Sequence, residues 1–315
     1  MSGPLVLMDA ASLYFRAFYA LPESMTAPDG TPVNAVRGFV DTITKVVTDR
    51  GAGRVVACLD ADWRPEFRVK ALPSYKAHRV AAEAVEGEED VPDTLTPQVP
   101  IILDVLDAVG IATAEAAGYE ADDVIGTLAH REATDPVEVI TGDRDLFQVV
   151  RDEPTPVKVL YLGRGWAKAE LLGPAELAVK YALPAESTGA AYAGMAVLRG
   201  DPSDGLPGVA GIGEKTAAKL LTEFGSLEAV LAAVHDGRDR KLTTRNRKAL
   251  LEAADYLAVA PTVVNVAVDA PIVQDRPDPV PAAPVDPARV ADLTARWGLG
   301  SSLPRLLTAL ERRVP

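Results

Sequence analysis

Short apolar runs alternate with longer amphipathic segments through the first half of the chain. Apolar runs of this length are typical of strands buried in a parallel sheet, and apolar residues three or four positions apart are typical of helices. The pattern predicts strands at 4–8, 54–59, 111–116, 137–140 and 157–162. It predicts helices at 10–21, 33–48, 97–109, 121–131 and 174–181. Strands separated by helices form βαβ units, so we expect an α/β fold with a mostly parallel central sheet.

The second half of the chain has a different pattern. A glycine-rich stretch spans 200–213, and seven prolines fall between 261 and 287. Proline-rich sequence with little periodicity is typical of extended backbone. This half is predicted to contain a helix at 214–224, one strand at 262–268, and small terminal helices at 286–298 and 301–313 that pack on the core.

Acidic residues follow several of the predicted strands. Because ligands of parallel sheets bind beyond the carboxyl ends of the strands, we expect these acids to share one site. The stretch GYEADD at 118–123 adds three more at a predicted helix start, of which the helix dipole explains one or two. With two from the glycine-rich stretch, the candidate acids are Asp9, Asp60, Glu120, Asp122, Asp123, Asp143, Asp145, Asp201 and Asp204. Carboxylates are the ligands that Mg²⁺ and Mn²⁺ prefer, so we interpret the nine as a hard-metal site of a nuclease.

A basic segment follows the second predicted strand. It carries Arg64, Arg68, Lys70, Lys76, His78 and Arg79, interleaved with Trp63, Phe67 and Tyr75, and then becomes acidic. Composition alone is compatible with a solvated loop at 64–96. Basic and aromatic side chains together also suit contacts to phosphates and bases. We therefore favour a mobile, partly helical flap over the site.

The glycine-rich stretch reads GDPSDGLPGVAGIGEKTAAKLL at 200–221. A Walker A loop requires lysine where Glu214 stands, and a dinucleotide fingerprint requires glycine where Thr216 stands. A glycine hairpin between two helices fits a helix-hairpin-helix clamp, in which backbone N–H groups at a helix start hold DNA phosphates. A plain helix–helix turn is the alternative. The clamp would use Gly211, Gly213, Lys215, Thr216 and Lys219.

Three bulk features of the sequence modify this picture. The net charge of −13 argues against nucleic acid, unless the acids hold cations and basic residues gather elsewhere. The single cysteine, Cys58, excludes a disulfide framework within the chain and favours a reducing compartment. No apolar run is long enough for a membrane span and no signal pattern begins the chain, so we expect a cytoplasmic protein.

Taken together, the motifs resemble those of the bacterial 5′ nucleases, which include the 5′→3′ exonuclease domain of DNA polymerase I and free-standing flap endonucleases. The motifs, in the family's order, are LMDA at 7–10, CLDA at 58–61, FR at 67–68, SYKAHR at 74–79, GYEADD, TGDRDLFQ at 141–148 and GDPSDGLPGVAGIGEKTA at 200–217. Gly205 departs from the family, where asparagine is common, and the segment after Arg79 is unusually acidic. Nothing follows residue 315, so we expect a free-standing member.

The resemblance implies a PIN-like core, a helical arch that threads or clamps the 5′ end, and a helix-three-turn-helix that grips duplex DNA. The expected division is a core at 1–200 with its arch at about 64–96, a duplex-binding region at 201–260, and a C-terminal part at 261–315. The implied activity is metal-dependent hydrolysis of phosphodiesters near 5′ single-strand/duplex junctions, leaving 5′ phosphate and 3′ hydroxyl. Substrates would be DNA with a 5′ flap, nick or 5′ overhang, including RNA-primed ends.

The resemblance also implies residue roles. Asp9, Asp60, Glu120 and Asp122 would serve one divalent ion, Asp143, Asp145 and Asp201 a second, and Asp123 and Asp204 would support the ligands. Arg68 and Lys76 would contact the scissile phosphate, Tyr75 would stack on the terminal base, and Tyr14, Arg16 and Arg79 would contact DNA. Backbone of Val209 and Ile212 would hold a potassium ion. We expect a monomer, with DNA polymerase I as a candidate partner protein.

Three other functions compete with this one. A non-catalytic DNA-junction clamp would keep the hairpin but would not need nine acids. A PIN-type ribonuclease would share the core, but such domains are shorter and lack the hairpin. A magnesium-dependent phosphatase is disfavoured because its DxDxT motif is absent at Asp9, which Ala10, Ala11 and Ser12 follow.

Overall fold

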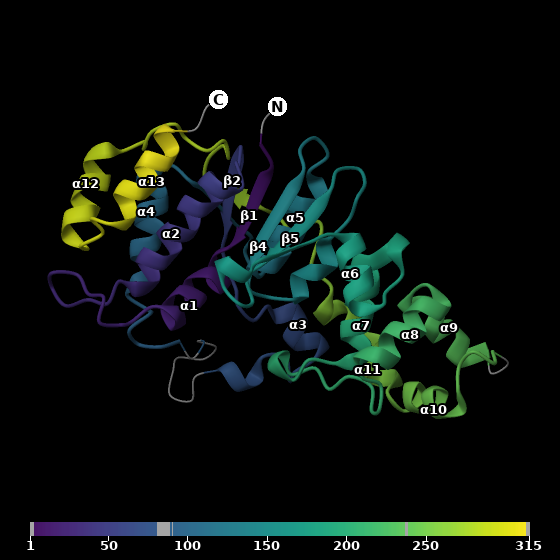
Figure 1. Ribbon diagram of the computed structural model, residues 1–315. Helices are drawn as coiled ribbons and strands as arrows, with labels where there is room; N and C mark the ends of the chain where they lie inside the picture. The colour runs from purple at the N-terminus through teal and green to yellow at the C-terminus, as the bar shows by residue number, and fades with distance from the viewer. Residues whose placement is uncertain (1–2, 81–88, 90, 237–238, 313–315) are drawn as a thin grey trace.

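The computed structural model describes residues 3–80, 89, 91–236 and 239–312. Within these residues seven strands form one sheet in the order β6-β5-β4-β1-β2-β3-β7 (Figure 1). Strands β1 to β5 pair in parallel, and the edge strands β6 and β7 are antiparallel to their neighbours. The strands are β1 Leu5–Asp9, β2 Arg54–Cys58, β3 Ala112–Glu115, β4 Val137–Thr141, β5 Val157–Tyr161, β6 Glu170–Leu172 and β7 Val273–Gln274. The predicted α/β fold with a mostly parallel sheet is confirmed.

Helices cover both faces of the sheet because its central strands are apolar on both sides. Successive strand residues point to opposite faces, so Val6 and Met8 of β1 join one buried cluster and Leu5 and Leu7 the other. On the Val6 side lie α1 Ala10–Ala20, α2 Asn34–Asp49, α4 Gln98–Val109, α12 Pro287–Arg296 and α13 Ser302–Glu311. On the Leu5 side lie α5 Ala121–Arg131, α6 Pro174–Tyr181 and α7 Thr188–Arg199.

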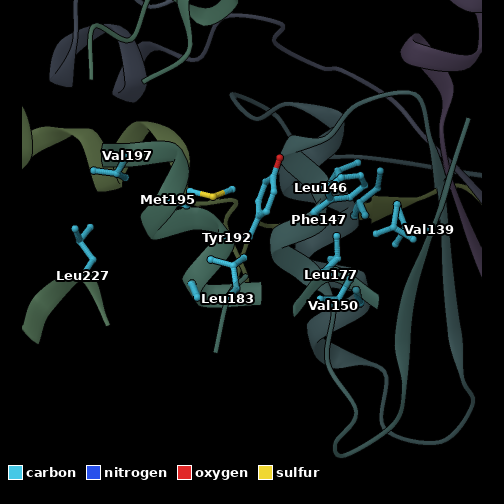
Figure 2. Packing of buried hydrophobic residues seen from close by; sticks show 14 of the residues in the cluster. Val139, Leu146, Phe147, Val150, Leu177, Leu183, Tyr192, Met195, Val197 and Leu227 are labelled. Atoms are coloured by element: carbon cyan, nitrogen blue, oxygen red, sulfur yellow. The ribbon is translucent and has the colours of Figure 1, made fainter. Parts of the chain in front are cut away.

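A group of helices extends from one end of the sheet, away from α12 and α13 (Figure 1). It contains α8 Glu214–Phe224, α9 Leu227–Asp236, α10 Thr244–Glu252 and α11 Ala254–Val264. Helix α7 joins this group to the sheet: Figure 2 shows Tyr192 and Met195 of α7 between Phe147 on the sheet side and Leu227 of α9. The rings of Tyr192 and Phe147 meet edge to face, with centroids 5.3 Å apart. Both parts therefore share one buried core, which fixes residues of each around the site.

Most predicted elements are confirmed, and one is wrong. The helices predicted at 121–131 and 214–224 have these bounds in the structure. The strand predicted at 262–268 does not form, because helix α11 continues to Val264 and includes Pro261. Val263 packs there against Tyr75 and Leu206, and this tertiary contact outweighs the β preference of a Thr-Val-Val sequence.

The expected flap is only partly described. After β2 the chain forms helix α3 Glu66–Ala71 and a short 3-10 turn at Ala77–Arg79. Val80 then forms an isolated antiparallel bridge with Glu89. The acidic part of the predicted arch, residues 81–88 and 90, lies outside the described residues. Among the residues described, no helix has the length and apolar character that crossing a membrane requires.

Candidate active site

A cavity of about 680 Å³ opens beside the carboxyl ends of β1, β2 and β4. Eight of the nine candidate acids line this cavity: Asp9, Asp60, Glu120, Asp122, Asp143, Asp145, Asp201 and Asp204. They come from five separate segments of the chain, and the ninth acid, Asp123, is buried below them. The structure thus brings the strand-end acids to one place, as the parallel sheet predicted.

Asp9 ties the ends of β1 and β4 together. It is the last residue of β1, and its side chain caps helix α1 by accepting a hydrogen bond from the backbone N–H of Ser12 at 3.1 Å. Its other oxygen accepts a hydrogen bond from the Thr141 hydroxyl at 2.6 Å. The Thr141 oxygen in turn accepts one from the backbone N–H of Asp143 at 2.8 Å. Thr141 therefore fixes the relative positions of two candidate acids.

The start of helix α5 supplies the second group of acids. Asp60, just beyond β2, accepts a hydrogen bond from the N–H of Ala121 at 2.8 Å. At the same helix start the Asp123 side chain accepts a hydrogen bond from the backbone N–H of Glu120 at 3.2 Å. Asp122 is the remaining acid of this turn and lines the cavity. The positive end of the α5 dipole lies among these carboxylates, which favours their negative charge.

Two further turns complete the acidic rim. Asp143 accepts a hydrogen bond from the N–H of Asp145 at 2.9 Å. Asp201 accepts bonds from the N–H and hydroxyl of Ser203 at 2.8 and 2.6 Å. A short 3-10 turn at Pro202–Asp204 then presents Asp204 to the cavity. Each acid thus has its backbone held by local hydrogen bonds.

Burial of so many carboxylates raises their pKa values. Burial raises the pKa of Asp9 from 3.8 to about 7, although the hydrogen bond from Thr141 opposes the rise. Burial followed by repulsion from neighbouring acids raises the pKa of Asp122 and of Asp145 well above the ordinary value. The pKa values of Asp60, Glu120 and Asp204 are also raised by burial. Carboxylates held in this way gain from a multivalent cation, because it stabilises their charged form.

The donor set fits a hard cation. The cavity offers carboxylate oxygens, and no histidine or cysteine is among the described residues that line it. Within the described part of the chain, no group of three acidic, histidine or cysteine side chains already stands in ligand geometry. The lining carboxylates would have to turn inward around an ion, which their open cavity permits. Oxygen ligands with room for water match the preference of Mg²⁺ or Mn²⁺.

Two basic side chains at the base of the predicted arch face the acids. Lys76 forms an ion pair with Glu120, and Arg79 pairs with Asp204 at 2.8 Å. Burial alone lowers the pKa of Lys76, but Glu120 and Asp204 raise it above the ordinary value. Lys76 therefore stays charged and, with Arg79, supplies positive charge inside an acidic cavity.

Arg68 does not have the exposed position expected for contact with a scissile phosphate. Its side chain is 2% exposed, and its guanidinium binds both oxygens of Asp123 at 2.7 Å and one oxygen of Glu120 at 2.6 Å. It also donates to the backbone carbonyl of Val263 at 3.0 Å. Arg68 thus links α3, the start of α5 and the end of α11 from below the cavity, and the expectation of direct phosphate contact is corrected.

Tyr75 also differs from expectation. Its ring is 3% exposed and packs with Leu206 and Val263, and its hydroxyl donates to Glu120 at 2.7 Å. A buried ring cannot stack on a terminal base, so this role is corrected too. Asp123 is fully buried and occupied by Arg68 and the N–H of Ala267, which agrees with a supporting position.

Other aromatic and charged residues do face the cavity. Arg16 lines it as expected, whereas Tyr14 is partly buried and packs against two hydrophobic clusters. Trp63, one of the aromatic residues of the basic segment, also lines the cavity, as do four residues that were given no role from the sequence: Phe15, Tyr19, Glu89 and Arg144. Helical spacing could have identified Phe15 and Tyr19, because residues four positions apart share a helix face.

The glycine hairpin lies outside this cavity. Gly211 has a positive φ of +77°, and Gly213 is the N-cap of α8, where an added Cβ would meet nothing within 4 Å. Val209 and Ile212 are buried, and the Ile212 N–H donates to the Val209 carbonyl at 2.9 Å. Exposed Lys215 and Lys219 follow on α8, and the N–H of Thr216 donates to the Gly213 carbonyl at 3.0 Å. The hairpin therefore presents a helix start and two lysines to solvent.

Comparison with known families agrees with the geometry. Residues 4–182 match the N-terminal resolvase-like domain of 5′-3′ exonucleases, and residues 187–288 match the C-terminal SAM fold of the same enzymes. The chain belongs to the 5′-3′ exonuclease family. The first match covers strands β1 to β6 and helices α1 to α6, and the second covers helices α7 to α11 and strand β7.

Individual relatives fit this assignment. A 5′-3′ exonuclease of Mycobacterium tuberculosis is 57% identical over 315 residues, covering 99% of both chains. DNA polymerase I of Mycobacterium bovis is 40% identical over 72% of this chain, which spans 24% of that longer protein. Among solved structures, the bacteriophage T5 flap endonuclease in a complex with DNA and metal ions has a TM-score of 0.63 at 18% identity, covering 98% of this chain and 99% of that one. The last likeness concerns the fold.

Proposed function

We propose that the chain is a divalent-metal-dependent 5′ nuclease that hydrolyses phosphodiesters near 5′ single-strand/duplex junctions, as exonuclease and flap endonuclease. The observation that carries this proposal is the convergence of eight carboxylates from five segments on one open cavity that also holds Lys76 and Arg79. Membership of the 5′-3′ exonuclease family and 57% identity to a full-length exonuclease support the reaction class.

Seven of the lining acids would hold two Mg²⁺ or Mn²⁺ ions: Asp9, Asp60, Glu120 and Asp122 one ion, and Asp143, Asp145 and Asp201 the other. When bound, two such ions activate a water molecule and stabilise the departing oxygen of a phosphodiester. Asp204 and Asp123 would support these ligands through Arg79 and Arg68. The hydrogen bonds of Thr141 hold two of the acids in place before any ligand arrives.

Lys76 and Arg79 would bind the phosphate that is cut. Both lie on the cavity wall, and both carry N–H donors opposite the acids. Fixed donors aimed at developing negative charge lower the barrier for phosphoryl transfer. Arg16, Phe15 and Tyr19 on the adjacent α1 would contact the strand that enters the cavity.

The hairpin and α8 would grip the duplex. Backbone N–H groups at the start of α8 and the exposed Lys215 and Lys219 suit phosphates in a sequence-independent way. We assign residues 201–260 to duplex binding, with a potassium ion on the backbone of Val209 and Ile212. The substrates would be DNA flaps, nicks and 5′ overhangs, with RNA-primed ends included, acted on in the cytoplasm by a monomer that works beside DNA polymerase I.

One assay tests the activity. A 5′-labelled flap DNA is incubated with the protein and Mg²⁺ or Mn²⁺, beside the variants Asp143→Ala and Asp41→Ala. Asp41 lies on the surface of α2, paired with Arg305, and serves as the matched control. We expect cleavage near the junction by the wild type and by Asp41→Ala, and its loss in Asp143→Ala. DNA binding without cleavage by the wild type would instead indicate a non-catalytic junction-binding protein, and equal activity in Asp143→Ala would refute the assigned site.

A further inference from the structure

The base of the predicted arch rests on the turn that carries Asp201 and Asp204. Ser74 Oγ donates to the Gly205 carbonyl at 2.8 Å, and the backbone N–H of Lys76 donates to the Asp204 carbonyl at 3.0 Å. Arg79 donates to the Ser203 carbonyl at 2.9 Å, in addition to its ion pair with Asp204. Residues 74–79 and 201–205 therefore form a junction, with one backbone–backbone hydrogen bond and further side-chain contacts, between parts that lie some 125 positions apart in sequence. We call this junction the arch-base contact.

Gly205 is the residue that allows the arch-base contact. Its φ is +76°, and a Cβ added to it would lie 2.0 Å from the backbone oxygen of Ser74 and 2.8 Å from its carbonyl carbon. Real Cβ atoms essentially never approach another heavy atom closer than 3.0 Å. The opposing atoms belong to the backbone, so no side-chain rotation can relieve the overlap. Any other residue at this position must therefore move the two segments apart by about 1 Å.

The displaced segment includes Lys76. This residue has a φ of 46°, an uncommon value for a residue with a side chain, and its backbone N–H is bound to the Asp204 carbonyl. From this fixed backbone its ammonium group reaches Glu120 inside the cavity. A shift of the backbone at residues 74–76 therefore moves the charged group relative to the acids. Misplacement of a catalytic group by about 1 Å can lower a rate by about 100-fold.

We propose that Gly205 is a positioning residue, which places Lys76 over the acidic cavity by letting the arch base contact the 201–205 turn directly. This inference rests on the proposed nuclease function. The proposed requirement for glycine at position 205 differs from a requirement for a positive φ alone. A positive φ is also accessible to asparagine, whereas the overlap with Ser74 excludes every side chain.

The test compares Gly205→Ala, Gly205→Asn and Gly51→Ala in the full chain. Gly51 has a φ of +60° with nothing within 4 Å of an added Cβ, and it precedes the amino end of β2, whereas the cavity lies beside the carboxyl ends of the strands. The Gly51→Ala variant thus reproduces the cost of a positive φ for alanine without an overlap between the added Cβ and neighbouring backbone atoms. In single-turnover cleavage of 5′-flap DNA we expect both Gly205 variants to lose about 10- to 100-fold in rate, and their Kd for the same DNA in EDTA to change less than about threefold. Gly51→Ala should cleave at the wild-type rate.

Hydrogen exchange measured by mass spectrometry tests the arch-base contact without relying on activity. The amide of Lys76 should be protected in the wild type and in Gly51→Ala, and should exchange faster in both Gly205 variants, because its bond to the Asp204 carbonyl is lost. Ser74→Ala removes one hydrogen bond of the contact without adding bulk. It is the milder variant to use if a Gly205 variant does not fold, and we expect faster exchange and a rate loss of about two- to fivefold.

Several outcomes would overturn the inference. Unchanged exchange and rate in the Gly205 variants would show that the contact does not depend on a bare glycine. Faster exchange with an unchanged rate would show that the contact does not position Lys76. A rate loss in Gly205→Ala that Gly205→Asn does not share would assign the effect to backbone strain. If wild-type protein cleaved no DNA, the nuclease function and the catalytic part of this inference would fail, while exchange would still report on the contact.

Discussion

Replacing Arg68 by alanine should be among the most damaging single changes to stability outside the apolar core. The guanidinium is 2% exposed and is shared by Asp123 and Glu120, whose side chains are 0% and 6% exposed. Removing one partner of a buried ion pair typically costs about 3–5 kcal/mol, because the remaining charge stays buried without compensation. Two acids lose their partner here, so we expect a loss of unfolding free energy toward the upper end of this range.

Urea denaturation followed by circular dichroism measures this loss, and Lys70→Ala on the same helix is the control. Lys70 is 70% exposed and pairs with Glu66 across one helical turn, so its removal should cost less than about 0.5 kcal/mol. The double variant Arg68→Ala/Asp123→Asn should be less damaged than the two single losses added together, because the pair interacts directly. Additive losses, or an Arg68→Ala loss as small as that of Lys70→Ala, would refute the buried network and restore Arg68 as a surface residue.

The loss in Arg68→Ala should also depend on pH. Burial raises the pKa of Glu120, and Lys76 and Arg68 oppose that rise. Without Arg68 the folded-state pKa of Glu120 goes higher still. An acid with a raised folded-state pKa stabilises the fold at low pH, and this stabilisation is lost as the pH rises through that pKa. The difference in stability between wild type and Arg68→Ala should therefore be larger at about pH 8 than at about pH 5.

Three further predictions concern metal, acids and DNA. Burial raises the pKa of Asp9 from 3.8 to about 7, so its protonation stabilises the metal-free fold at low pH, and this contribution is lost as the pH rises through about 7. The Tm in EDTA should therefore fall from about pH 5 to about pH 8, and Mg²⁺ should reduce the fall. A Tm that depends on neither pH nor metal would contradict the shared acidic site. Asp122→Asn should reduce the Tm increase that Mn²⁺ causes, while Asp123→Asn should lower the Tm in EDTA because Asp123 binds Arg68. Lys215→Gln with Lys219→Gln should weaken flap-DNA binding in a filter assay and reduce its log–log salt slope by about two, and an unchanged slope would remove the hairpin lysines from the DNA contact.

The sequence predicted the convergence of the acids on one cavity because strand patterning determines it. Buried runs that end in aspartate identify the carboxyl edge of a parallel sheet, and the structure places Asp9, Asp60 and Asp143 at that edge. The helix start at Glu120 is likewise set by local capping, which is visible as short-range pattern. Features of this kind depend on neighbours within a few positions of each residue.

The buried positions of Arg68 and Tyr75 could not be predicted from such local patterns. Their segment has the composition of an exposed basic loop, but the groups that bury them include Val263 and, for Tyr75, Leu206, more than a hundred positions away. The same region of α11 was predicted as a strand, so sequence pattern could not place a helix end against α3. Because the end of α11 was predicted as a strand, the buried network around Arg68 and Tyr75, which depends on this helix end, could not be predicted.

The arrangement of charge would explain how a chain of net charge −13 could hold a polyanion such as the proposed DNA substrate. In the cavity, the positive groups of Lys76 and Arg79 are occupied by Glu120 and Asp204, so without metal they offer little to a phosphate. Lys76 holds the Oε1 oxygen of Glu120, so it would release this oxygen if Glu120 became a ligand of a divalent ion. The ion would add positive charge, and the ammonium group of Lys76 would be free close to where the scissile phosphate would lie. Metal binding should in this way convert a cavity that repels DNA into one that attracts it, without any change in the fold.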